Sequence, residues 1–181
     1  MVEWADDVMT QAEVGGAARV DPGTGLQRPG YMIRDFILQS SSGQNIQISS
    51  FRGRANLVLV FPGYSGAMRI LLEDAARYSR EFLELEATVV VVSPRQQQEN
   101  TLNPSILVLH DSTHAVHRLY GATDEHGRPV PVVYVTDRYG EIISTYAAPG
   151  HIMPPKLEEI LGTLEFLNQQ CPECEPPEWP R

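Results

Sequence analysis

Cysteine is the residue whose scarcity matters most for the chemistry of this chain. Only two of the 181 residues are cysteine, and both stand in one C-x-x-C motif, Cys171-Pro172-Glu173-Cys174. Residues 1–170 therefore hold no thiol that could serve as a nucleophile or a metal ligand. Any thiol chemistry must come from the last eleven residues.

Positive charge and long apolar runs are also scarce. Lys and Arg number 14 against 23 Asp and Glu, which gives a net charge of -9 and a pI near 5.0. Without a basic stripe to neutralise phosphates, we expect no nucleic-acid partner and no anionic-membrane partner. No apolar stretch approaches the ~20 residues of a membrane span. The start, Met1 to Asp7, lacks the basic and apolar regions of a signal peptide, so we expect a cytoplasmic protein.

What is present begins with a strand, a turn and a helix in direct succession. The apolar run Leu57 to Phe61 alternates too little for a strand wetted on one face, which predicts a central strand covered on both sides. From Ala67 the period becomes helical and predicts one long helix. Its buried stripe would comprise Met68, Leu71, Leu72, Ala75, Tyr78 and Phe82. Such a turn brings loop residues, unpaired N–H groups and a helix dipole to one point.

The rest of the chain alternates strands and helices in one α/β domain. We predict strands at 36–39, 44–48, 88–93, 106–109, 132–136 and 141–146, and helices at 112–120 and 156–170. The first two strands form a hairpin. We divide the chain into an N-terminal extension and linker at 1–29, with a short helix near 2–14, a domain at 30–170, and a proline-rich tail at 171–181.

Five segments resemble one family. Residues 52–62, Arg-Gly-Arg-Ala-Asn-Leu-Val-Leu-Val-Phe-Pro, resemble the "fRGk..vLvFyP" segment of the alkyl hydroperoxide reductase/thiol-specific antioxidant family, the peroxiredoxin-like redoxins. Residues 30–38, 108–111, 119–121 and 131–142 match, in the family's order, "G..aPdFtL", "vLsD", "aYGv" and "P.tfviDr.G.i". The resemblance covers roughly residues 30–166 and implies a thioredoxin-like fold: a mixed central sheet flanked by helices, with an N-terminal hairpin.

The chain departs from this family at the reactive positions. Peroxiredoxins carry P-x-x-x-T-x-x-C here, and counting from Pro62 places Gly66 at the threonine and Arg69 at the peroxidatic cysteine. A thioredoxin-type C-x-x-C motif aligned without gaps on the same turn also places its cysteines at Gly66 and Arg69. An alignment shifted by one residue places them at Ser65 and Met68. Peroxide reduction needs a thiolate that becomes a sulfenic acid, which arginine cannot supply. Ser65 would need a positioned base.

The resemblance thus implies a relic active site, which we define as Tyr64, Ser65, Gly66, Arg69 and Pro131. Pro131 aligns with the cis-proline that faces the redox site in thioredoxin folds. We predict a cis bond here; the alternative is a trans proline at the start of an edge-like strand.

Arg69 has an unfavourable position near a helix N-terminus, where the dipole is positive. Two partners would offset this. One is a bound small anion or carboxylate, held also by the N–H groups of Ala67 and Met68. The other is Glu73, four residues on along the same helical face. Both alternatives stay open on the sequence.

Three histidines, His110, His114 and His117, follow one another at spacings of four and three. The spacing could bring imidazoles to one face, but no carboxylate or cysteine completes a metal set. Our default interpretation is solvated or hydrogen-bonded histidines. We expect no cofactor and no resident metal.

The C-x-x-C of Cys171 and Cys174 allows three interpretations: a separate redox pair, half of a four-cysteine zinc site shared by two chains of a homodimer, or a structural tail. The last helix would carry the pair about 22 Å from the relic active site. Two functions follow. The chain is a thiol-disulfide oxidoreductase acting through Cys171 and Cys174 on a thiol or disulfide partner protein, or it is a non-catalytic thioredoxin-fold binding or interaction module.

Overall fold

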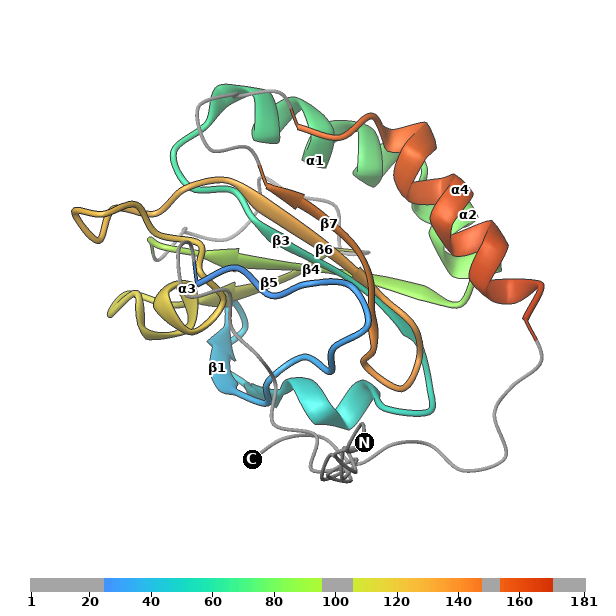
Figure 1. Ribbon diagram of the computed structural model, residues 1–181, viewed down its shortest axis with the longest axis horizontal. Coiled ribbons are helices and arrows are strands. Elements are labelled where there is room, and N and C mark those ends of the chain that lie inside the picture. Colours follow the sequence, from blue (N-terminus) through green and yellow to red (C-terminus); the bar gives the residue numbers. More distant parts are fainter. Residues whose placement is uncertain (1–24, 96–105, 148–153, 171–181) are drawn as a thin grey trace, which may run out of the picture.

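Seven strands form one mixed sheet in the computed structural model of the chain, which describes residues 25–95, 106–147 and 154–170 (Figure 1). The strand order is β2-β1-β5-β4-β3-β6-β7. The strands are β1 (Ile37–Ser40), β2 (Asn45–Gln47), β3 (Asn56–Phe61), β4 (Ala87–Ser93), β5 (Ile106–His110), β6 (Val132–Thr136) and β7 (Ile142–Ala147). The central three, β3, β4 and β5, are parallel, and the other pairings are antiparallel. The predicted mixed sheet and N-terminal hairpin are confirmed.

Helices cover both faces of this sheet (Figure 1). They are the 3-10 helix η1 (Ile48–Phe51) and the α-helices α1 (Gly66–Arg77), α2 (Ser79–Glu84), α3 (Ala115–Leu119) and α4 (Leu157–Asn168). Buried residues of α1, α2 and α4 form one hydrophobic core with the sheet. Buried residues of η1 and α3 form a second core on the opposite face. The sheet is therefore the middle layer of three.

β3 is one of the strands that contribute buried residues to both cores. All six of its residues are buried, as the unbroken apolar run predicted. Val58 and Val60 point into the α1 core, while Leu57, Leu59 and Phe61 point into the α3 core, because successive side chains of a strand face opposite sides. Each such buried side chain contributes about 1.5–3 kcal/mol to folding. The turn that carries the relic active site therefore directly follows a fully buried strand.

The prediction of one long helix after β3 is wrong in one respect, because the structure has two helices, α1 and α2, with a break at Tyr78. Tyr78 has φ -94° and ψ 25°, ends α1 and precedes α2. Its side chain is 44% exposed, although the helical stripe predicted it buried. The break leaves the period intact, since Ala75 and Phe82 are seven residues apart and both buried. A periodicity argument cannot detect such a break.

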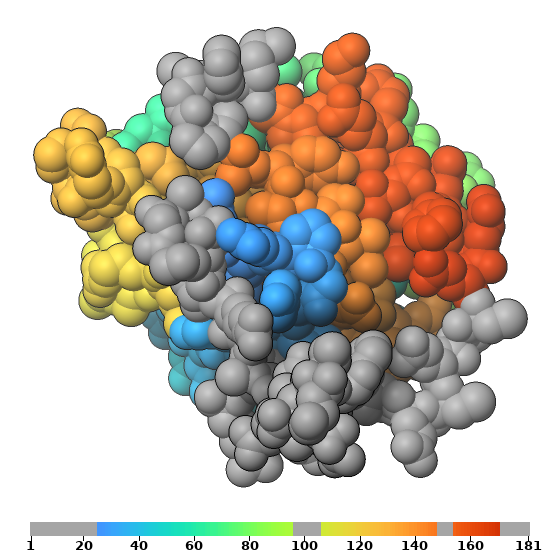
Figure 2. Space-filling view, in the orientation of Figure 1, coloured from blue at the N-terminus to red at the C-terminus, as the bar shows by residue number. Residues whose placement is uncertain are grey.

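The N-terminal part of the described chain runs along the outer edge of the sheet. Met32 pairs with Glu141 just before β7, and the peptide N–H of Gly30 donates to the carbonyl of Ile142 at 2.8 Å. Figure 2 shows this blue segment beside the orange residues of β7. The predicted helix near 2–14, residues 15–24 of the predicted linker and the tail at 171–181 lie outside the described residues. Residues 25–29, the described end of that linker, pack on the domain, and Gln27 is buried. The domain boundaries stay predictions. Within the described residues, no helix is long and apolar enough to cross a membrane.

Candidate functional site

The turn between β3 and α1 packs on the chain that leads into β6. Gly63 has φ 54°, and a Cβ there would lie 3.0 Å from the carbonyl oxygen of Pro129 and 3.1 Å from the nitrogen of Pro131. Only glycine allows this approach together with this backbone conformation. The peptide N–H of Ser65 closes the turn by donating to the carbonyl of Pro62 at 3.3 Å. The structure thus brings Pro131 against the turn, as the resemblance implied.

The predicted cis bond at Pro131 is wrong, because the described residues contain no cis peptide bond. Pro131 directly precedes Val132, which pairs with Phe61 in the antiparallel ladder of β3 and β6. A trans proline continues the extended chain into this strand, and its missing N–H costs no ladder hydrogen bond at that point.

Arg69 is held by its own helix in the structure. Its Nη1 lies 2.6 Å from Oε1 of Glu73, and the side chains of Arg69 and Glu73 are 72% and 43% exposed. The intramolecular alternative of the sequence analysis is therefore present. The first N–H groups of α1 nevertheless have no side chain of this helix end as their hydrogen-bond acceptor. Its first turn has no acidic residue and no side-chain cap, and the buried Oγ of Ser65 has no hydrogen-bond partner.

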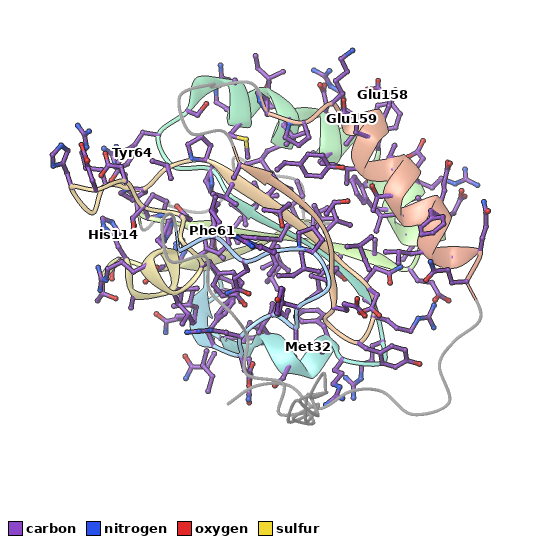
Figure 3. All side chains as sticks on the ribbon, viewed as in Figure 1. Met32, Phe61, Tyr64, His114, Glu158 and Glu159 are labelled. Atoms are coloured by element: carbon purple, nitrogen blue, oxygen red, sulfur yellow. The ribbon has the colours of Figure 1, made fainter. Side chains whose placement is uncertain are left out.

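A second arginine, which the sequence analysis missed, lies at this end of the sheet. Arg95 follows β4, and its guanidinium carbon stands 4.8 Å from the ring centroid of Tyr64. Tyr64 is 57% exposed and lies at the outer edge of the molecule (Figure 3). The signal was available in principle, because β3 and β4 are parallel neighbours and their carboxyl ends meet. Sequence alone did not show that Arg95 would turn back over Tyr64.

A buried carboxylate and imidazole form a second polar centre, which the sequence analysis also missed. Nδ1 of His117 lies 2.7 Å from Oδ2 of Asp111, and the two side chains are 0% and 1% exposed. The same carboxylate accepts the peptide N–H groups of Ala115 at 3.0 Å and His117 at 2.8 Å. Asp111 therefore caps the first N–H groups of α3.

Hydrogen bonding decides the ionisation of this carboxyl. Burial alone would raise the pKa of Asp111, but the hydrogen bonds from the His117 side chain and backbone, the charge of His117 and the N–H of Ala115 together hold that pKa below its ordinary value. The pair is a structural tie between β5 and α3.

The Asp111 and His117 pair does not serve Ser65. The His117 ring packs at 5.2 Å from the Phe61 ring, on the α3 face of the sheet. Ser65 directly precedes α1, whose buried residues lie on the other face. Figure 3 shows Phe61 inside the molecule and Tyr64 at its edge. Ser65 therefore has no positioned base in the described structure, which agrees with its exclusion as a nucleophile.

The three histidines make no metal centre. No group of three or more His, Cys, Asp or Glu in the described part of the chain could hold a metal ion. His110 is hydrogen-bonded to Ser41 and to the carbonyl of Arg95. His114 lies with its ring 5.7 Å from that of His117. Hydrogen-bonded and packed rings match the default interpretation.

Comparison with known proteins assigns the family. The model of the AhpC/TSA family matches residues 29–145, which is more than half of the chain. The chain belongs to the AhpC/TSA family. No curated protein matches this AhpC/TSA protein in sequence.

Solved structures agree on the thioredoxin-like fold. Mycobacterium bovis AhpC is 17% identical, with 83% of this chain and 98% of that chain covered at a TM-score of 0.68. The reduced 2-Cys peroxiredoxin of Plasmodium vivax is 11% identical, with 77% and 96% covered at 0.66. The peroxidoxin BcpB of Mycobacterium tuberculosis is 18% identical, with 77% and 97% covered at 0.63. At these identities, the likeness concerns the fold alone.

Cys171 and Cys174 of this AhpC/TSA protein lie outside the described residues. The end of α4 that precedes them is described. Nδ2 of Asn56 lies 3.3 Å from Oδ1 of Asn168, so the helix ends beside the first residue of β3. The relic active site follows the last residue of that strand. The chain toward the C-x-x-C therefore starts at the opposite end of the sheet.

Proposed function

We propose that this AhpC/TSA protein is a binding module that holds a small anion or carboxylate at the relic active site and is not a peroxidase. The observation that carries the proposal is the N-terminus of α1, which has no acidic residue in its first turn and no side-chain cap, with one arginine on the helix and a second beside the turn that leads into it. Arg69 stands where the family resemblance places the peroxidatic cysteine, and Arg95 lies over Tyr64 beside the same turn. In the described structure Arg95 makes no ion pair with a carboxylate.

The energies allow an anion to compete for Arg69. An exposed ion pair such as that of Arg69 and Glu73 contributes only about 0–1 kcal/mol. An anion at the turn would gain charge-assisted hydrogen bonds from a guanidinium and from first-turn N–H groups, which an i,i+4 partner cannot reach. Rotation of one exposed side chain is enough to release Arg69.

The test is an anion titration followed by amide chemical shifts. Sulfate, phosphate and acetate should move the amides of residues 64–69, and Arg69→Ala should weaken the binding at least several-fold. Arg77→Ala is the matched control, because Arg77 is on the same helix, is also 72% exposed and pairs with Asp74. Unmoved amides, or equal binding by Arg69→Ala, would mean that Glu73 alone satisfies the arginine and that the site is a structural relic.

The proposal also predicts the absence of peroxidase activity at this turn. The protein should not consume hydrogen peroxide or alkyl hydroperoxides at the rates of cysteine-bearing relatives, because the turn supplies no thiolate. The measurement is peroxide consumption by the wild type and by the Cys171→Ser, Cys174→Ser double variant. Fast peroxide consumption by the double variant would contradict the prediction that this turn has no peroxidase activity.

A second candidate function is thiol-disulfide exchange with a partner protein through Cys171 and Cys174. Its support is that all the thiols of the chain stand in one C-x-x-C, beyond a helix that ends far from the relic active site. Thiol titration with elemental analysis separates the alternatives. A reversible disulfide supports exchange. Zinc at half an ion per chain in a homodimer supports a shared four-cysteine site, and inert thiols without metal leave the binding module alone.

A further inference from the structure

Ser41 and His110 form a pair at the end of β5, outside the relic active site. The Oγ of Ser41 lies 3.2 Å from Nε2 of His110. On the other side of the ring, Nδ1 lies 3.1 Å from the carbonyl oxygen of Arg95. A hydroxyl, an imidazole and an oxygen acceptor thus follow one another within hydrogen-bond reach, and each comes from a different segment of the chain.

The carbonyl of Arg95 fixes the tautomer of the ring. A carbonyl oxygen can only accept, so Nδ1 carries the proton and donates it. In the neutral ring, Nε2 then has the lone pair and accepts the hydroxyl proton of Ser41. A serine whose proton is directed at an imidazole that a third group orients is the arrangement of an activated nucleophile. Here a backbone carbonyl takes the orienting role.

The neighbouring serines do not share this environment. The hydroxyls of Ser40 and Ser42 lie 2.9 Å apart and bond to each other. Ser41 alone of the three faces an imidazole, and both Ser41 and His110 are partly exposed. Its backbone is held by a 3.2 Å hydrogen bond from its N–H to the carbonyl of Val108. The pair is fixed on the sheet and reachable from solvent.

We propose that Ser41 and His110 are a nucleophile and general base that accept the acyl group of small carboxylic esters. The Oγ of Ser41 bonds to the ester carbonyl carbon while its proton passes to Nε2 of His110. The carbon–oxygen bond to the alcohol then breaks, and the alcohol leaves with that proton. Water, deprotonated by the same Nε2, hydrolyses the acyl-serine and restores the pair. The step involves no oxidation or reduction.

The test uses a fluorophosphonate probe and p-nitrophenyl acetate on the full chain. The probe should label Ser41, as mapped by peptide mass spectrometry, and the acetate should give a burst of one nitrophenolate per chain in protein that the probe has not labelled. Ser41→Ala should abolish both. His110→Gln should slow them by about 10²-fold, the usual contribution of a general base. Imidazole in the buffer should partly restore a His110→Ala variant.

Two replacements serve as matched controls, namely Ser42→Ala for an adjacent exposed serine and His126→Ala for an exposed histidine. In both variants the probe should label Ser41 at the wild-type rate. Circular dichroism checks that each variant is folded. An unlabelled Ser41 in folded wild-type protein, or a His110→Gln variant that labels as fast as the wild type, would overturn the proposal. Neither result depends on Arg69, so this test and the anion titration fail independently.

Discussion

Gly121 meets a neighbouring backbone more closely than any side chain would permit. A Cβ at this position would lie 2.3 Å from the carbonyl carbon of Gly25 and 2.4 Å from the nitrogen of Leu26, and φ is +64°. This crossing holds the start of the described chain against α3 and the aromatic core beneath it. Here Gln27 is buried, and its peptide N–H donates to the hydroxyl of Tyr134 at 3.4 Å.

Gly121→Ala should therefore destabilise the protein beyond the cost of its backbone conformation. The left-handed conformation costs about 1–2 kcal/mol for a residue with a Cβ, and the displaced backbone of Gly25 and Leu26 adds to it. Gly127→Ala is the matched control, since Gly127 has φ +74° but no atom within 4 Å of its added Cβ. Urea unfolding measures both variants. Equal losses would show that the crossing contributes nothing.

The buried carboxylate of Asp111 should make stability depend on acid pH. Its folded-state pKa lies below its ordinary value, so its contribution is complete above about pH 4 and is lost as the pH falls through the folded-state pKa. Asp111→Asn should lower the stability at pH 7 by about 1–3 kcal/mol, because an amide group would face the N–H donors of α3. It should also flatten the loss below pH 4.

Thermal melts between pH 2 and 7 measure this effect. Asp124→Asn is the control, because Asp124 is a turn carboxylate that also accepts backbone N–H groups but pairs with an exposed arginine, Arg128. Its replacement should cost less than that of Asp111. Parallel melting curves for wild type and Asp111→Asn below pH 4 would contradict the linkage.

At the scale of elements, the sequence predicted what depends on local pattern. The strands β3 and β4, the hairpin of β1 and β2, and the last helix, α4, follow from runs and periods of apolar residues, and the structure confirms them. The break at Tyr78 was not predictable in this way, because it preserves the helical period. The trans bond at Pro131 was missed because the family resemblance outweighed the local preference for trans.

In the candidate site, too, the sequence predicted what lies within one segment and missed the contacts between segments. The turn after β3 was predictable, since one continuous segment carries Tyr64, Ser65 and Arg69. The contacts that join separate segments were not. The stacking of Arg95 on Tyr64 depends on how the chain turns after β4, and the pairing of Asp111 with His117 depends on how α3 is placed over the end of β5, which no spacing encodes. Of the two arginines at the site, sequence reasoning therefore found only Arg69, in the helix that follows the turn.

At the scale of the whole molecule, the sheet is the layer that both cores need. Val60 of β3, Val91 of β4 and Val108 of β5 lie in register across the parallel strands. Val91 is 2% exposed and belongs to the core beneath α1, α2 and α4. Damage at this point separates three helices from the sheet, so the effect on folding should be global.

Val91→Asp should unfold the protein. An unpaired buried charge costs several kcal/mol, against a total stability of about 5–15 kcal/mol for a domain. Ile37→Asp is the matched control, because it makes a comparable apolar-to-charged change on a strand of the same sheet where the side chain is 60% exposed. Circular dichroism and thermal melting should show an unfolded Val91→Asp and a folded Ile37→Asp protein. A folded Val91→Asp protein with an unchanged melting temperature would mean that β4 is not the buried centre of this sheet.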